Sequence, residues 1–146
     1  MLRQTLRRLY RQLRLSSYRS MFGAIRERSG SLSATEAFSA DVIQLLGTPT
    51  LSQFAQCLGI SQPNATYKVN SLVAKGYLVK VPGKDRREVC LQTAGKFNAY
   101  YDDNEQALRD AVDSLGTQFS PEELATANRV MQALVQTVET EKGANL

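Results

Sequence analysis

The stretch KVPGKDRREVCLQ, residues 80–92, constrains the fold of this chain more than any other part of its sequence. Its Pro-Gly pair is typical of a turn, and the segments YLVKV and EVCLQ on either side are typical of short strands. A β-hairpin is therefore predicted, with Lys84, Asp85, Arg86 and Arg87 at its tip. A basic solvated loop would explain these charges, and so would a loop that contacts something negatively charged.

Three short helices are predicted before the hairpin. Ser33 with Glu36 and Thr50 with Gln53 fit capping boxes, in which side chain and backbone satisfy each other's N–H groups. The third helix starts at Ser61, and the glycines at 47, 59 and 76 fit the helix ends. The side chains expected to face the core are, helix by helix, Phe38, Val42, Leu45 and Leu46; Leu51, Phe54, Ala55 and Leu58; and Ala65, Val69, Leu72 and Val73.

Longer helices with apolar stripes are predicted at both ends of the chain. The N-terminal segment is Arg-rich and free of acids, as mitochondrial presequences also are. Its apolar stripe continues towards residue 28. This favours a helix that is part of the folded protein, because a presequence that is cleaved off does not need an apolar stripe of this length. Two helices follow the hairpin, the second capped at Ser120. The three stripes are Leu2, Leu6, Leu9 and Leu13; Phe97, Tyr101, Leu108, Ala111 and Leu115; and Leu124, Ala127, Met131, Leu134 and Val138.

The predicted fold class is mainly α with a small β-hairpin wing (α+β). The order of elements makes a winged helix-turn-helix flanked by long N- and C-terminal dimerisation helices. A core of three short helices and a hairpin cannot cover the stripes of the long helices, so these predict a homodimer. The predicted domains are an N-terminal dimerisation helix at 1–30, a winged helix-turn-helix DNA-binding domain at 31–95, and C-terminal dimerisation helices at 96–146.

The net charge of +4 is unevenly distributed along the chain. Residues 1–28 carry +7 and residues 60–97 carry +5, whereas residues 98–146 carry −6. Basic parts combined with an acidic end indicate a polyanionic partner for only part of the surface.

The helix that begins at Ser61 is the best candidate for a recognition helix. An α-helix fits the major groove of B-DNA, and residues near its N-terminus usually meet base edges. The amides of Gln62 and Asn64 can pair with adenine, and a polar solvated face is the alternative interpretation. The residues predicted to contact DNA from this helix are Ser61, Gln62, Asn64, Thr66, Tyr67, Lys68 and Asn70.

The wing and the preceding helix supply further candidate DNA contacts. Arginine is attracted to the enhanced negative potential of a narrow minor groove. Asp85 is expected to hold the guanidinium of Arg86 or Arg87 by a charge-assisted bond, leaving the other, together with Lys84, to reach DNA. Phosphate contacts are predicted at Thr50 and Ser52, where hydroxyls and a helix N-terminus coincide.

Several other kinds of function are disfavoured by what the sequence lacks. There is no histidine, no Cys/His ligand cluster and no nucleotide-binding glycine motif, so we expect no enzyme, no metal and no cofactor. No apolar run is long enough to span a membrane, and a cytoplasmic location is expected. Ordinary packing is favoured over redox sensing for the two cysteines, with Cys57 partly exposed and Cys90 pointing outward from its strand.

At residues 50–97 the chain resembles the MarR family of bacterial transcription regulators, and its flanking helices also match the architecture of that family, so the resemblance spans nearly the whole chain. The resemblance rests on LSQFAQCLGIS as the helix-turn, VNSLVAKGYLVK as the end of the recognition helix with the first wing strand, and DRREVCL as the wing. Asp85 and Arg87 fit the Asp-x-Arg signature of the family's wing. The wing is about one residue shorter than in many members, and Thr93 and Ala94 stand where an apolar residue and a threonine are usual.

The resemblance implies a homodimer that binds double-stranded DNA at a pseudo-palindromic operator, usually as a repressor. It also implies Arg87 as the wing arginine, residues 62–68 as the base-reading segment, and in many members a small aromatic effector that releases DNA. The zinc-sensing and peroxide-sensing branches are disfavoured, because this chain has no histidine and no cysteine in its first helix. The alternative is a winged-helix module that binds a protein partner without specific DNA binding; the basic segment 60–97 favours DNA. A third interpretation, the first helix as a membrane-surface element, rests on its arginines alone.

Overall fold

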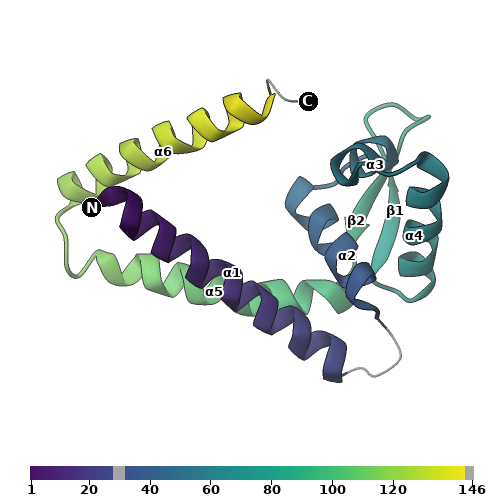
Figure 1. The fold of residues 1–146 in the computed structure, drawn as a ribbon, viewed down its shortest axis with the longest axis horizontal. Helices are drawn as coiled ribbons and strands as arrows, with labels where there is room; N and C mark the ends of the chain where they lie inside the picture. Colours follow the sequence, from purple (N-terminus) through teal and green to yellow (C-terminus); the bar gives the residue numbers. More distant parts are fainter. Residues whose placement is uncertain (28–31, 144–146) are drawn as a thin grey trace. The chain divides into compact units, whose positions relative to one another are not determined.

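The computed structural model describes residues 1–27 and 32–143. Its elements in chain order are α1 (Leu2–Glu27), α2 (Ala34–Leu46), α3 (Leu51–Leu58), α4 (Gln62–Ala74), β1 (Leu78–Pro82), β2 (Val89–Thr93), α5 (Gly95–Leu115) and α6 (Pro121–Gly143) (Figure 1). The predicted fold class, mainly α with a β-hairpin wing, is confirmed. The chain forms two compact units, Met1–Asn104 and Glu105–Leu146. The division into three domains remains a prediction.

The helices begin where their capping residues predict. The Ser33 hydroxyl accepts from the Glu36 N–H while the Glu36 carboxylate accepts from the Ser33 N–H, and Thr50 forms the same reciprocal pair with Gln53. Ser61 caps α4 with a single bond from the Asn64 N–H. Because each cap satisfies donors that have no partner inside the helix, it fixes where the helix starts.

The hairpin is antiparallel, with Leu78 opposite Thr93 and Pro82 opposite Val89. A third segment joins its open edge, since the Leu91 N–H donates to the Pro49 carbonyl over 2.8 Å and Thr50 bridges Cys90. In Figure 1 the two strands lie beside α2, α3 and α4. The wing is therefore anchored to the backbone that leads into α3.

One core holds α2, α3, α4 and the hairpin together. Phe54, Tyr77 and Leu91 are almost completely buried at its centre. The predicted inward faces of α3 and α4 are confirmed, with Leu51, Leu58 and Val73 partly buried at the edge. The C-terminal half of α1 joins this unit through Met21, which is buried, and Ile25, which packs against the core.

The predicted inward face of α2 is wrong for three of its four residues. Phe38, Leu45 and Leu46 are 43%, 73% and 44% exposed, and only Val42 packs against the core. The buried side chains of α2 are instead Ala37, Ser39, Ala40 and Ile43. The small side chains of Ala37, Ser39 and Ala40 allow the neighbouring elements to approach the helix closely beside Ile43. Phe38 packs edge-on against Tyr18 of α1, with 6.2 Å between ring centroids.

The two cysteines lie in different environments. Cys90 is buried, contrary to the outward orientation predicted for it, whereas Cys57 is exposed. The alternation along β2 is interrupted, because Cys90 and Leu91 are both buried while Val89 is exposed. Cys90 lies beneath the turn, where a Cβ at Gly83 would be 3.2 Å from its sulfur.

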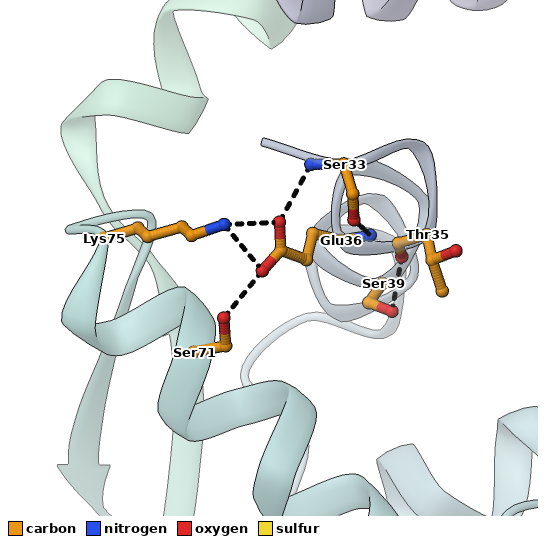
Figure 2. A network of polar contacts seen from close by, with 6 residues as sticks. All are labelled: Ser33, Thr35, Glu36, Ser39, Ser71 and Lys75. Carbon is orange, nitrogen blue, oxygen red and sulfur yellow. Dashed lines mark hydrogen bonds and ion pairs between the residues drawn. The ribbon is translucent and has the colours of Figure 1, made fainter. Parts of the chain in front are cut away.

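A polar cluster joins the start of α2 to the end of α4 (Figure 2). The Lys75 ammonium donates to both oxygens of Glu36 at 2.8 and 2.9 Å, and the Ser71 hydroxyl donates to Oε1 at 2.6 Å. The Ser33 N–H donates to Oε2 at 2.8 Å. Desolvation would raise the pKa of Glu36, but the bonds from Lys75, Ser33 and Ser71 outweigh it and lower the pKa to about 2.

Replacing Glu36 with Gln tests this cluster. A carboxyl whose pKa falls from 4.5 to about 2 on folding stabilises the fold above pH 4.5 and loses that contribution as the pH falls towards 2. Glu36→Gln should therefore lower the free energy of unfolding at neutral pH by about 1–2 kcal/mol, after a discount for the partly exposed Lys75. It should also flatten the pH dependence across that window.

Urea unfolding at fixed protein concentration, repeated between pH 7 and pH 2, measures both effects. Glu88→Gln, at an exposed position of the wing, is the matched control and should leave the stability unchanged. A Glu36→Gln variant that retains the wild-type pH profile would contradict the role given to this carboxylate.

Candidate nucleic-acid interface

The exposed face of α4 carries the polar side chains predicted to read DNA. Ala65, Val69 and Leu72 fill the buried face of this helix. Tyr67, the aromatic side chain of this helix, is 77% exposed. The positions that surround it on the accessible side are Gln62, Asn64, Thr66, Lys68 and Asn70, of which Thr66 and Lys68 are half-buried.

Two hydroxyls predicted to contact DNA are engaged with their own helix. The Ser61 hydroxyl accepts from the Asn64 N–H at 3.3 Å, and the Thr66 hydroxyl donates to the Gln62 carbonyl at 2.9 Å. Ser61 therefore starts the helix, and Thr66 has only its methyl group and oxygen lone pairs to offer a ligand.

The helix-turn-helix is held at its outer surface by a contact between α3 and α4. The Gln62 amide donates to the Ser52 hydroxyl over 2.6 Å. Gln62 and Ser52 were predicted to serve different purposes, one for bases and one for phosphate. The structure brings them together as neighbours, because Gly59 turns the chain between the helices in a left-handed conformation (φ 64°).

Asn70 connects the recognition helix to the wing. Its carbonyl oxygen accepts from the Lys80 ammonium on β1 over 2.9 Å. Lysine can only donate, so this bond fixes the orientation of the Asn70 amide and turns its NH₂ group away from Lys80. Sequence reasoning missed Lys80; the available signal was a cation on an exposed strand position next to the predicted helix.

The wing tip is organised by backbone bonds. The Asp85 carboxylate accepts from the Arg87 N–H at 3.2 Å, the Glu88 N–H donates to the Asp85 carbonyl, and the Gly83 N–H donates to the Glu88 carbonyl. The expectation that Asp85 holds a guanidinium is wrong, since the partner of its carboxylate is the Arg87 backbone N–H and neither the Arg86 nor the Arg87 guanidinium forms an ion pair with it. Asp85 therefore shapes the turn. An aspartate carboxylate easily reaches the backbone N–H two residues further along the chain, whereas a bond to an arginine guanidinium would also have to order that long side chain.

Both guanidiniums and the Lys84 ammonium are consequently exposed at the tip. Exposed arginine side chains without a carboxylate partner retain their full charge for a polyanion. Thr50, in contrast, is half-buried and its hydroxyl caps α3. The predicted contacts of all these residues with DNA remain predictions.

Neither a metal site nor a membrane span is found in the part of the chain that the structure describes. No group of three or more His, Cys, Asp or Glu side chains there could hold a metal ion. Along the same residues, no helix is both long and apolar enough to cross a membrane.

The arrangement of α3, α4 and the β1–β2 wing defines a winged helix-turn-helix protein. Residues 41–88 match the model of the MarR family, which confirms the resemblance noted in the sequence. A sequence search of curated proteins found no relative.

Solved structures with the same fold include three that are each less than 25% identical to this chain. FabT of Streptococcus pneumoniae in complex with DNA is 22% identical, with coverage of 95% of this chain and 96% of that chain and a TM-score of 0.55. A mutant of MepR from a multidrug-resistant S. aureus clinical isolate is 10% identical, covers 94% and 97%, and has a TM-score of 0.59. A mutant MarR from E. coli complexed with operator DNA is 18% identical, covers 89% and 93%, and has a TM-score of 0.50. At these identities the likeness establishes the fold alone.

Replacing Gly83 with Ala tests how tightly the wing turn is packed. A Cβ at this position would lie 2.8 Å from the Glu88 Cβ and 3.2 Å from the Cys90 sulfur. Because the Glu88 Cβ is bonded directly to the backbone and cannot move away without it, Gly83→Ala should destabilise the protein by about 1–3 kcal/mol. Gly95→Ala is the matched control, because nothing lies within 4 Å of its added Cβ. Urea unfolding measures the difference, and equal stability of the two variants would contradict the packing argument.

Proposed function

We propose that this chain is a sequence-specific DNA-binding transcriptional regulator that acts as a homodimer on a pseudo-palindromic operator. The observation that supports this proposal most strongly is that the exposed face of α4 and the wing are held next to each other. The exposed polar face of α4 and the cationic wing belong to one packed unit and are tied together by the Asn70–Lys80 bond. A major-groove reader and a minor-groove reader must keep a fixed spacing to bind one duplex.

In this proposal α4 enters the major groove. Gln62, Asn64 and Tyr67 meet base edges, while Lys68 contacts a phosphate or a guanine. Arg87 at the wing tip enters the adjacent minor groove, and Thr50 and Ser52 approach the phosphate backbone at the start of α3. Phosphate contacts supply affinity, and base contacts supply sequence preference.

The homodimer is supported by the apolar side chains left uncovered on the long helices. Leu9 and Leu13 of α1 and Val135 and Val138 of α6 are each more than 40% exposed. Uncovered apolar stripes at helical spacing are characteristic of helices that pack on another chain. A symmetric dimer would present two copies of α4 to an inverted repeat.

Repression and release by a small aromatic effector complete the proposal. Both come from the family resemblance, in which a bound dimer blocks transcription and an effector lowers its affinity for DNA. The alternative is a winged helix that docks on a protein partner. Five basic residues between 75 and 87, against only Asp85, favour DNA over such a partner.

Selection of bound duplexes from a random DNA pool at near-physiological salt tests the proposed function. Enrichment of an inverted repeat with half-sites about one helical turn apart would support both the dimer and specific binding. Binding without enrichment would contradict sequence specificity. No binding by effector-free, refolded protein would favour the protein-partner alternative.

Replacing Arg87 with Ala tests the wing. Loss of a minor-groove guanidinium should weaken binding to the selected operator by about 1–3 kcal/mol while the fold stays intact. Arg86→Ala, which removes the same charge from the neighbouring position, is the matched control and should have the smaller effect. Fluorescence anisotropy with labelled operator measures both variants. Equal losses, or normal binding by the Arg87 variant, would contradict the assignment of Arg87.

A further inference from the structure

The first half of α1 presents a row of arginines along an exposed helix. Residues 1–26 contain seven arginines and no aspartate or glutamate. Arg3, Arg7 and Arg11 recur at every fourth residue, so they lie on one face of the helix, and all three are exposed. None of them forms an ion pair with any residue that the structure describes.

Such a row is unfavourable for an isolated helix. Like charges four residues apart destabilise a helix by about 0.2–0.5 kcal/mol per pair. The same segment exposes apolar side chains, with Leu2, Leu9 and Leu13 at 57%, 46% and 42%. This half of the helix would gain stability from a partner that covers its exposed leucines and neutralises its arginines.

The other unit of the chain has complementary properties. Residues 105–146 carry seven carboxylates against three cations. Asp110, Asp113 and Glu139 are exposed on α5 and α6, and none forms an ion pair within the described residues. Apolar side chains lie exposed on the same two helices, among them Val112 and Leu134.

We propose that the arginine row of α1 docks on the acidic α5–α6 region of a second copy of this chain. The inference rests on the proposed homodimer and adds the charge pairing that sets its strength and orientation. In a two-fold symmetric dimer each copy supplies one basic and one acidic surface, so both pairings form together. The exposed leucines of α1 then lie against the apolar seams of the same partner helices, and opposite charges flank that contact.

A charge-exchange experiment tests this pairing directly. One variant carries Arg3→Glu, Arg7→Glu and Arg11→Glu; the other carries Asp110→Lys, Asp113→Lys and Glu139→Lys. Alone, each variant places like charges against each other and should dimerise at least about tenfold more weakly than wild type at low salt. Mixed in equal amounts, they should form a heterodimer close to wild-type strength, because every pairing is again between opposite charges. Analytical ultracentrifugation measures all three samples.

The salt dependence of wild-type dimerisation provides the second measurement. The dimer dissociation constant should rise as sodium chloride increases from about 0.05 M to about 0.5 M, because exposed pairs are screened. If the Glu or Lys variants do not fold, as judged by circular dichroism, Gln at Arg3, Arg7 and Arg11 replaces them. The Gln variant should dimerise more weakly and lose most of the salt dependence, whereas Arg86→Gln, with one wing charge removed, should retain both.

The outcomes separate this inference from the proposed function. A wild-type dimer dissociation constant that does not change with salt, or variants that dimerise normally, would overturn the charge pairing but not the proposed dimer. Weak variants that mixing does not restore would overturn it in favour of pairing within one chain. The wild-type protein could instead bind anionic vesicles of phosphatidylglycerol. If the Arg3→Glu, Arg7→Glu, Arg11→Glu variant lost that binding and still dimerised normally, the arginine row would belong to a membrane-binding surface and the charge pairing would be overturned. A wild-type chain that stays monomeric would overturn both the pairing and the proposed dimer.

Discussion

The winged helix depends on a core in which Phe54, Tyr77 and Leu91 are enclosed by three short helices and a hairpin. Ala37 and Ala40 on α2 and Ala65 on α4 let the helices approach one another around these large side chains. The core fixes the angle between α3 and α4 and anchors β2 through the backbone bond from Leu91 to Pro49. The spacing between the exposed face of α4 and the wing tip is thus a consequence of packing beneath them.

Local patterns predicted those parts of the fold that depend on neighbours in sequence. The capping boxes at Ser33 and Thr50 lie where the sequence placed them, because each is determined within about four residues. The hairpin tip also falls at residues 84–87 as predicted, but Pro82 ends β1 opposite Val89 and is not part of the turn. The inward face of α2 could not be predicted in this way. Helical periodicity marks an apolar stripe but does not say which of two stripes meets the core, and in α2 it is the stripe of Ala37, Ala40 and Ile43.

In the candidate interface, too, only the features that depend on neighbours in sequence were predictable. The sequence identified α4 and the wing, whereas contacts between remote residues became visible only in the structure. Lys80 reaches Asn70 across ten residues and Lys75 reaches Glu36 across thirty-nine, so neither bond follows from a local pattern. For Asp85 the sequence predicted an ion pair with a neighbouring arginine side chain. In the structure the partner of its carboxylate is the nearer backbone N–H of Arg87.

Charge would then act at two levels in the proposed regulator. The wing and α4 attract phosphates, and the row formed by Arg3, Arg7 and Arg11 attracts the acidic helices of the second copy. Salt screens exposed pairs of both kinds. If dimerisation and DNA binding are coupled, the measured salt slope of operator binding at protein concentrations near the dimer dissociation constant exceeds the slope due to released counterions alone. The excess vanishes when the protein is concentrated enough to remain dimeric, because only the phosphate contacts then respond to salt. The slope at high concentration therefore counts phosphate contacts, and the difference between the two slopes reports the charge pairing between the copies.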